Sequence, residues 1–283
     1  MGYVHPESLV DTAWLAERLD DPKISVVDGS WHMPAMKRDP AAEFLERHIP
    51  GAVFFDVDAI SDPDSDLPHM MPSEELFAAK VGELGISSDD HVVVYDTNGL
   101  SSAARAWWMM RAFGHDKVSV LDGGLPKWMA EGRPVESGAV HPRPAAFRAK
   151  LNRNLLVTVD DVRANIDSRR ADVLDARSAG RFRGTEAEPR AGLRGGHIPG
   201  SFSLPYTELL NPADKTVRDA DALDAAFDKS GIGRDRPVIT SCGSGITACV
   251  LALGLHLVGR KDVAVYDGSW TEWGGRSDTP IET

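Results

Sequence analysis

Cys242 lies in the stretch VITSCGSGITACVLALGLHLVG, residues 238–259, where an apolar run reaches a glycine-rich turn and then takes the pattern of a helix. The chain has two cysteines, and the other, Cys249, lies in the same stretch. Gly243 and Gly245 permit a tight loop that leaves backbone N–H groups uncovered. With the free N–H groups of a helix start, such a loop forms a nest for an anion. The pattern indicates a thiolate nucleophile. A small buried cysteine at a strand end is the alternative.

Other chemistries of the same loop are disfavoured by single positions. A cysteine phosphatase needs an arginine six residues after the cysteine, and Ala248 stands there. A serine-hydrolase elbow, G-x-S-x-G, fails because Cys242 replaces the first glycine before Ser244. The loop contains no Gly-Lys pair of a P-loop.

A metal site is not expected. Cys242, Cys249 and His256 are spaced by seven residues, but an apolar helix that packs a cysteine and a histidine is the simpler explanation. The sequence has no H-E-x-x-H and no paired C-x-x-C motif. We expect Cys249 to be buried and inert, because a loop residue and a residue in the following helix rarely meet disulfide geometry.

The elements around this loop predict an α/β fold. In the second half of the chain, short apolar runs at 171–177, 236–241 and 262–268 alternate with helical patterns at 220–232 and 247–259. Such alternation is typical of a parallel sheet with helices on both faces. Ligands of such sheets bind beyond the carboxyl ends of the strands. Cys242 follows directly on the strand predicted at 236–241.

The two halves of the chain repeat each other. RHIPGAVFFDVDAI at 47–60 matches GHIPGSFSLPYTEL at 196–209, and 92–124 runs parallel to 238–269. We therefore predict two domains, residues 1–139 and 155–283, joined by a Pro- and Arg-rich linker at 140–154. His48 and His197 occur symmetrically in the two copies, which favours a structural turn over catalysis.

Composition limits the partners. The chain has 283 residues and a net charge of −12, which argues against nucleic acid or an anionic membrane surface. It contains no apolar stretch near the ~20 residues that span a bilayer and no basic, apolar leader at residues 1–19. With only two cysteines, we expect a cytoplasmic protein.

CGSGIT, GRFRGTEAEPR at 180–190, GHIPG and the tandem repeat together resemble the two-domain sulfurtransferases of the rhodanese superfamily. The resemblance covers nearly the whole chain. It implies two rhodanese-like domains, each a mainly parallel sheet with helices on both faces, of which the second is active and the first inactive. Asp96 stands in the first copy where Cys242 stands in the second, and a carboxylate cannot carry a persulfide.

The resemblance also implies a reaction. Cys242 would take sulfur from a donor as a persulfide and pass it to a small thiol, thioredoxin or cyanide, without a cofactor. The uncharged residues after Cys242 are similar to those of members that use 3-mercaptopyruvate and release pyruvate. Members that use thiosulfate carry basic residues there, and they remain the alternative donor class. A rhodanese-like binding module without activity is the alternative of a different kind.

Site residues follow from the same resemblance. Arg181 and Arg190 would bind the donor's carboxylate through their guanidinium groups, although an arginine-rich solvated loop is the simpler alternative. Ser244 would hydrogen-bond the donor and, with Asp58 and His69 from the first domain, handle protons. Asp58 as a turn residue and His69 as a surface residue are the alternatives. The loop residues that would surround the reacting sulfur are Gly243, Gly245, Ile246 and Thr247.

Overall fold

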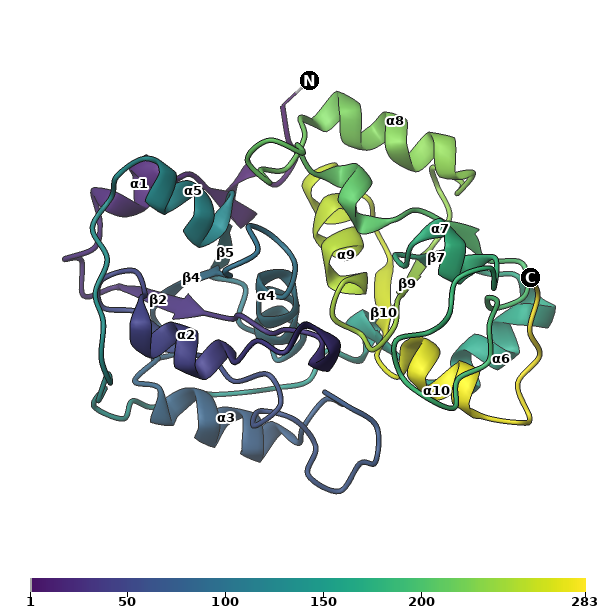
Figure 1. The fold of residues 1–283 in the computed structure, drawn as a ribbon, viewed down its shortest axis with the longest axis horizontal. Helices are drawn as coiled ribbons and strands as arrows, with labels where there is room; N and C mark the ends of the chain where they lie inside the picture. The colour runs from purple at the N-terminus through teal and green to yellow at the C-terminus, as the bar shows by residue number, and fades with distance from the viewer. Residues whose placement is uncertain (1) are drawn as a thin grey trace.

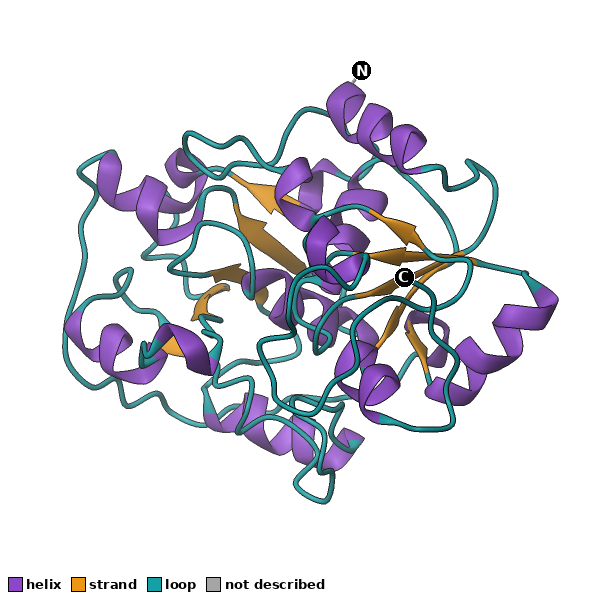
Figure 2. Cartoon of the chain, turned by 45° about the vertical axis from the view of Figure 1, so that its right-hand side comes forward, coloured by secondary structure: helices purple, strands orange, loops and turns teal. Residues whose placement is uncertain are grey.

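The computed structural model describes residues 2–283, which form two α/β domains side by side (Figures 1 and 2). Each contains a five-stranded sheet in which all neighbouring strands are parallel, with the orders β1-β5-β4-β2-β3 and β6-β10-β9-β7-β8. The strands of the first sheet are β1 (Leu9–Val10), β2 (Ile24–Asp28), β3 (Val53–Phe54), β4 (His91–Tyr95) and β5 (Val118–Leu121); those of the second are β6 (Leu156–Val157), β7 (Asp172–Asp175), β8 (Phe202–Ser203), β9 (Val238–Ser241) and β10 (Val263–Tyr266). The repeat in the sequence is therefore a repeat of one topology.

Helices cover both faces of each sheet, as the sequence predicts. The first domain contains α1 (Thr12–Ala16), α2 (Pro40–Glu46), α3 (Glu74–Glu83), α4 (Ala103–Ala112) and α5 (Gly124–Ala130). The second contains α6 (Val159–Ser168), α7 (Ala179–Phe182), α8 (Ala220–Ser230), α9 (Ala248–Leu257) and α10 (Ser269–Gly275). Short 3-10 helices are η1 (Pro6–Ser8), η2 (Pro34–Met36), η3 (Arg153–Leu155) and η4 (Tyr206–Leu209).

Local sequence explains where the elements begin and end. All four residues of β9, VITS, are buried, as expected of a parallel strand covered on both faces. Asp219 caps α8 by accepting from the N–H of Ala222, and Gly231 ends the helix with φ 95°. Only glycine adopts that backbone conformation without strain, so Gly231 explains where α8 ends.

The two domains share one hydrophobic core. Its apolar side chains come from α3 and α4 of the first domain and from α8 and α9 of the second. The helices α4 and α9 pack against each other at the centre of the molecule (Figure 1). Each domain has a second, smaller core on its outer face, around Trp128 in the first domain and Trp273 in the second.

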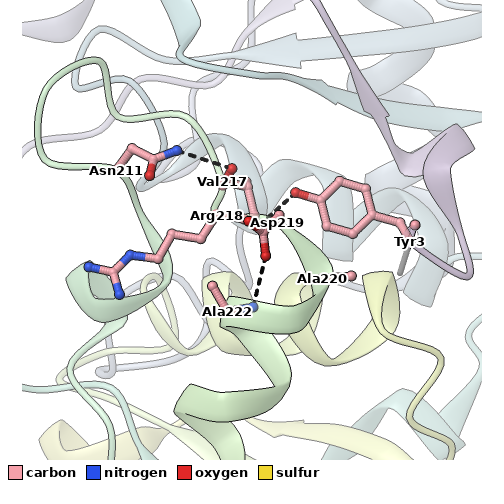
Figure 3. A pocket seen from close by; sticks show the side chains of 8 residues that line it. Tyr3, Asn211, Val217, Arg218, Asp219, Ala220 and Ala222 are labelled. Atoms are coloured by element: carbon pink, nitrogen blue, oxygen red, sulfur yellow. Dashed lines mark hydrogen bonds between the residues drawn. The ribbon is translucent and has the colours of Figure 1, made fainter.

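The segment between the domains and the start of the chain are each held by hydrogen bonds to a domain. Between α5 and η3 the chain runs along the first domain, where Ala145 donates to the Gly82 carbonyl and Lys150 to the Phe113 carbonyl, both at 2.9 Å. At the start of the chain, the Tyr3 hydroxyl donates to the Arg218 carbonyl of the second domain at 2.6 Å (Figure 3). A wide hollow of about 660 Å³ lies between Tyr3 and the start of α8.

Candidate active site

Cys242 follows the last residue of β9 and lies in the loop that leads into α9. Its N–H donates to the Ser269 hydroxyl at 3.1 Å, and its carbonyl accepts from the N–H of Trp270 at 2.9 Å. The start of α10 therefore fixes the backbone on both sides of the sulfur. In the part of the chain that the structure describes, the N–H groups of residues 243–247 donate to no acceptor. The loop thus holds a row of unused donors next to the thiol.

The first domain shows what such a loop binds. The Asp96 carboxylate accepts from the N–H groups of Asn98 at 2.8 Å, Ser101 at 2.7 Å and Ala103 at 2.8 Å. Asn98 is the counterpart of Ser244, and Ala103, like Ala248, is the first residue of the following helix. The loop of Asp96 is one residue longer (97–102 against 243–247), and it is an internal example of an anion held by amides at this place in the fold.

A pocket of about 590 Å³ opens over Cys242 between the two domains. Five of the predicted site residues that line it come from the second domain's loop: Cys242, Gly243, Ser244, Ile246 and Thr247. Arg181 and Arg190 line it as well. The first domain contributes the wall around Trp31, Met33 and Met36. The structure therefore brings the nucleophile and both predicted arginines together.

The two arginines differ in their partners. Among the described residues, Arg190 has no carboxylate within 4 Å. Burial lowers the pKa of the Arg190 guanidinium from its ordinary value, and the nearby Cys242 sulfur opposes that shift. Arg181 lies against Gly243 and forms a 2.6 Å ion pair with Glu188. Arg190 is thus the guanidinium left to meet an incoming anion.

Glu188 is a buried partner of Arg181 that no sequence pattern predicts. Its side chain is 2% exposed and bridges Arg181 to Arg177, which lies 2.7 Å from the other carboxylate oxygen. Arg177 is itself buried and paired with Asp175 at 2.6 Å. Glu188 lies within the motif GRFRGTEAEPR, so its place in the sequence was visible, but its burial was not. Arg194, a few residues further along, donates to carbonyls of the C-terminal segment at Trp273, Gly274 and Thr279.

Asp58 and His69 form a pair with each other. The His69 Nδ1 lies 2.5 Å from an Asp58 carboxylate oxygen, and the Trp31 indole donates to the other oxygen at 3.0 Å. Burial lowers the pKa of His69, while the same hydrogen bond and charge of Asp58 raise it. The pKa of Asp58 is below its ordinary value; burial raises it, but the hydrogen bond from His69 and the charge of Arg190 lower it. The His69 imidazole is therefore neutral near pH 7.

Ser244 stands apart from this pair. Its side chain is buried and lines the pocket, but it has no hydrogen bond to Asp58 or His69 among residues 2–283. Trp31 connects the two places, because it lines the pocket with Ser244 and contacts the His69 ring edge-on at 4.7 Å between centroids. A proton-handling role for Ser244, Asp58 and His69 stays a prediction.

The fold and the loop define a class of protein. The rhodanese-like domain family matches residues 11–131 and again residues 158–276. The chain therefore belongs to the rhodanese family and carries two copies of its domain.

Known relatives resemble the whole chain. It is 46% identical over 272 residues to the 3-mercaptopyruvate sulfurtransferase of Homo sapiens, a match that covers 94% of this chain and 91% of the relative. It is also 46% identical over 283 residues to the thiosulfate sulfurtransferase of Bos taurus, with 98% and 94% covered. The crystal structure of SseA from Escherichia coli, described with the mechanism of 3-mercaptopyruvate sulfotransferases, superposes with a TM-score of 0.86 at 45% identity, covering 93% of this chain and 98% of SseA.

Within residues 2–283, none of the helices is long and apolar enough to cross a membrane.

Proposed function

We propose that this protein transfers sulfur from 3-mercaptopyruvate to a thiol or cyanide acceptor through a persulfide on Cys242, and releases pyruvate. One observation carries the proposal: the thiol lies beside unused amide donors whose counterparts bind a carboxylate in the first copy. An amide nest of this kind stabilises a sulfur anion before and after transfer.

The first half-reaction forms the persulfide. The Cys242 thiolate attacks the donor sulfur, so that an S–S bond forms and the carbon–sulfur bond breaks. The electron pair of that bond remains on carbon as the enolate of pyruvate, which takes a proton from water. Arg190 binds the donor's carboxylate, because a guanidinium matches a carboxylate with two hydrogen bonds. Arg181, already paired with Glu188, lies against Gly243 and supports the wall of the loop.

The second half-reaction unloads the enzyme. The acceptor, a small thiol, thioredoxin or cyanide, attacks the outer sulfur, and the S–S bond to Cys242 breaks. The leaving electron pair regenerates the Cys242 thiolate, and the product is a persulfide or thiocyanate. No cofactor takes part in either step. We assign Ser244 to the donor's carbonyl or thiol, and Asp58 with His69 to proton handling at the edge of the pocket.

The first domain is inactive in this proposal, because Asp96 fills its loop with a carboxylate in place of a sulfur. The division into domains 1–139 and 155–283 is part of the same proposal. Both cysteines are unpaired, as expected in a reducing compartment, which supports a cytoplasmic location.

The alternative donor is thiosulfate, whose sulfurtransferase in Bos taurus is as similar to this chain as the human 3-mercaptopyruvate enzyme. Residues 243–246 contain no lysine or arginine. The thiosulfate dianion would then depend on Arg181 and Arg190, and Arg181 already pairs with Glu188. This charge balance favours a donor with a single carboxylate.

The test measures each donor with the same protein. We expect 3-mercaptopyruvate to give pyruvate and a mass gain of one sulfur on Cys242, with higher kcat/KM than thiosulfate. Cys242→Ser abolishes the mass gain, while Cys249→Ser, a change at the buried second thiol, retains it. Equal or faster turnover with thiosulfate would reverse the donor assignment, and a mass gain in Cys242→Ser would remove the assignment of the nucleophile.

A further inference from the structure

Arg105 lies at the centre of the molecule and belongs to the first domain, yet it contacts the loop of Cys242. It is on α4 and its side chain is 0% exposed. Its Nη1 donates to an Asp267 carboxylate oxygen at 2.5 Å and to the Gly245 carbonyl at 3.2 Å. Its Nη2 donates to the His69 carbonyl. A single guanidinium therefore joins three segments that meet at the pocket.

The contact with Gly245 fixes the direction of an amide. A peptide group is planar and trans, so the Gly245 carbonyl and the Ile246 N–H point in opposite directions. With the carbonyl held by Arg105 and by the Cys249 Sγ–H at 3.2 Å, the Ile246 N–H must face away from Arg105. Ile246 lines the pocket beside Cys242. Arg105 thus sets the orientation of one donor of the sulfur cradle.

The loop has no room for a side chain at this point. Gly245 has φ 76°, and a Cβ there would lie 2.7 Å from the Asp267 carbonyl oxygen and 3.0 Å from Arg105 Nη1. The close approach of the loop to Arg105 and Asp267 therefore requires glycine.

The same guanidinium holds the segment of His69. His69 has φ 61°, a left-handed conformation that costs a non-glycine residue free energy. Its carbonyl accepts from Arg105, and two residues later the Met71 N–H donates to the second Asp267 oxygen at 2.7 Å. The pair of Arg105 and Asp267 therefore supports the backbone that presents His69 to Asp58.

The equivalent position in the second domain holds no guanidinium. Helices α4 and α9 align with an offset of 145 residues, so the counterpart of Arg105 is Val250 and the counterpart of Asp267 is Asp122. Asp122 accepts from the Val217 N–H of the other domain at 2.8 Å, which mirrors the bond of Asp267 to Met71. Asp122 has no arginine partner among the described residues. Each domain thus has an aspartate that accepts from an N–H group of the other domain. Only the aspartate beside the Cys242 loop, Asp267, is also paired with an arginine.

We propose that Arg105 is a positioning residue for sulfur transfer: held by Asp267, it orients the amide cradle of Cys242 and the backbone of His69 from the neighbouring domain. The proposal rests on the proposed function only in requiring a Cys242 persulfide. The cradle holds sulfur itself, so Arg105 serves either donor.

The test separates the rate at each site from the number of folded sites. Single-turnover mixing with excess donor gives an amplitude, which counts competent Cys242 thiols, and a rate constant for persulfide formation. We expect Arg105→Met and Arg105→Lys to lower this rate constant by about 10- to 100-fold, the usual range for groups that orient a catalytic shell. KM should change less than about threefold, because Arg181 and Arg190 are not among the Arg105 contacts. Lysine retains the charge for Asp267 but lacks the fork that reaches both carbonyls.

Controls keep the outcomes distinct. Arg111→Met changes another arginine of α4, paired with Asp116 at 3.4 Å and away from the pocket, and should leave rate and amplitude unchanged. If the Arg105 variants do not fold, Asp267→Asn should lower the rate constant in the same way. A per-site rate within about twofold of wild type in every folded variant, with only the amplitude reduced, overturns the proposal. A wild-type protein that forms no persulfide with 3-mercaptopyruvate or thiosulfate instead overturns the proposed function.

Discussion

Glu188 pairs with one of the two pocket arginines, Arg181, and not with the other, Arg190. Its side chain is almost completely buried, and with Asp175, the other partner of Arg177, it balances the charges of Arg177 and Arg181. Arg190 is then the pocket guanidinium whose charge no neighbouring carboxylate balances among the described residues. A charge-assisted bidentate pair is stronger than a neutral hydrogen bond. We therefore expect the donor's carboxylate to gain most of its binding free energy from Arg190.

At this residue we expect a change in binding with little change in the chemical step. Arg190→Met should raise the KM for 3-mercaptopyruvate about 10- to 100-fold, since a hydrogen bond to a charged group contributes about 1.5–3 kcal/mol. Initial-rate kinetics with both donors measure it. Arg183→Met, at an exposed position of the same motif, is the matched control and should leave KM unchanged. An unchanged KM in Arg190→Met would contradict its assigned role.

Single residues also mark how far the sequence could be interpreted. Cys242, its glycines and Asp96 lie next to the loop amides that surround them, so a short motif predicts their arrangement. Arg105 has partners 36, 140 and 162 residues away. In the sequence it is one of two arginines in an otherwise apolar helix, and no neighbouring residue indicates which carbonyls it contacts. The burial of Glu188 between Arg177 and Arg181 likewise depends on the folded structure and could not be predicted from the motif.

Among the elements, α9 is apolar on every side. Nine of its ten residues are buried, and His256 is the exception. A helix of this kind belongs in a core, and α4 and α8 of the two domains provide one. Its C-terminal turn is fastened to the N-terminal segment, where the His256 Nε2 lies 3.1 Å from the Ser8 hydroxyl and the ring stacks on His5 at 4.2 Å.

This contact should make stability depend on pH. Burial, with the charge of Arg111, lowers the pKa of His256 to about 3, against about 6.5 in an unfolded chain. The unfolded state therefore binds the proton first, and the stabilisation is complete above pH 6.5 and lost as the pH falls toward 3. We expect His256 to account for about 1 kcal/mol of lost stability between neutral pH and about pH 5, after solvent screening.

Denaturant unfolding of wild type and His256→Gln across that range measures the effect. The glutamine retains a hydrogen-bonding group for Ser8 but does not titrate, so its stability should fall less with pH. Other buried histidines titrate equally in both proteins and cancel in the difference. Parallel curves would contradict this assignment.

At the level of elements the sequence was a good guide. The alternation of apolar strands and helical patterns depends on local periodicity, and the second domain's predicted strands and helices are confirmed within a few residues. The pairing of α4 with α9 was not predicted, because an apolar helix does not reveal which surface will cover it.

For the whole molecule, the domains dock by reciprocal contacts. Asp267 of the second domain accepts from Met71 of the first, and Asp122 of the first accepts from Val217 of the second. Burial raises the pKa of Asp122 to about 6. The pocket over Cys242 takes its walls from both domains, so the first domain completes the pocket of the second.

The two domains should therefore not separate into working halves. Residues 155–283 expressed alone would expose the α4-facing side of α9, and we expect them to aggregate or to lack fixed packing. Size-exclusion chromatography and near-UV circular dichroism measure this, with the two halves expressed together as the control. A monomeric second half that forms the persulfide at the wild-type rate would contradict both this expectation and the positioning role of Arg105.

The loops of Asp96 and Cys242 differ in whether their backbone N–H groups have an acceptor from the protein. In the first copy a carboxylate satisfies the amides permanently, and that loop has nothing further to gain. In the second copy the corresponding N–H groups have no acceptor from the protein among the described residues. A group that binds them only in the native state stabilises that state. We therefore expect the persulfide form of the protein to have a higher free energy of unfolding than the thiol form. The loop of Asp96, whose amides bind a carboxylate of the protein itself, is the internal reference for that difference.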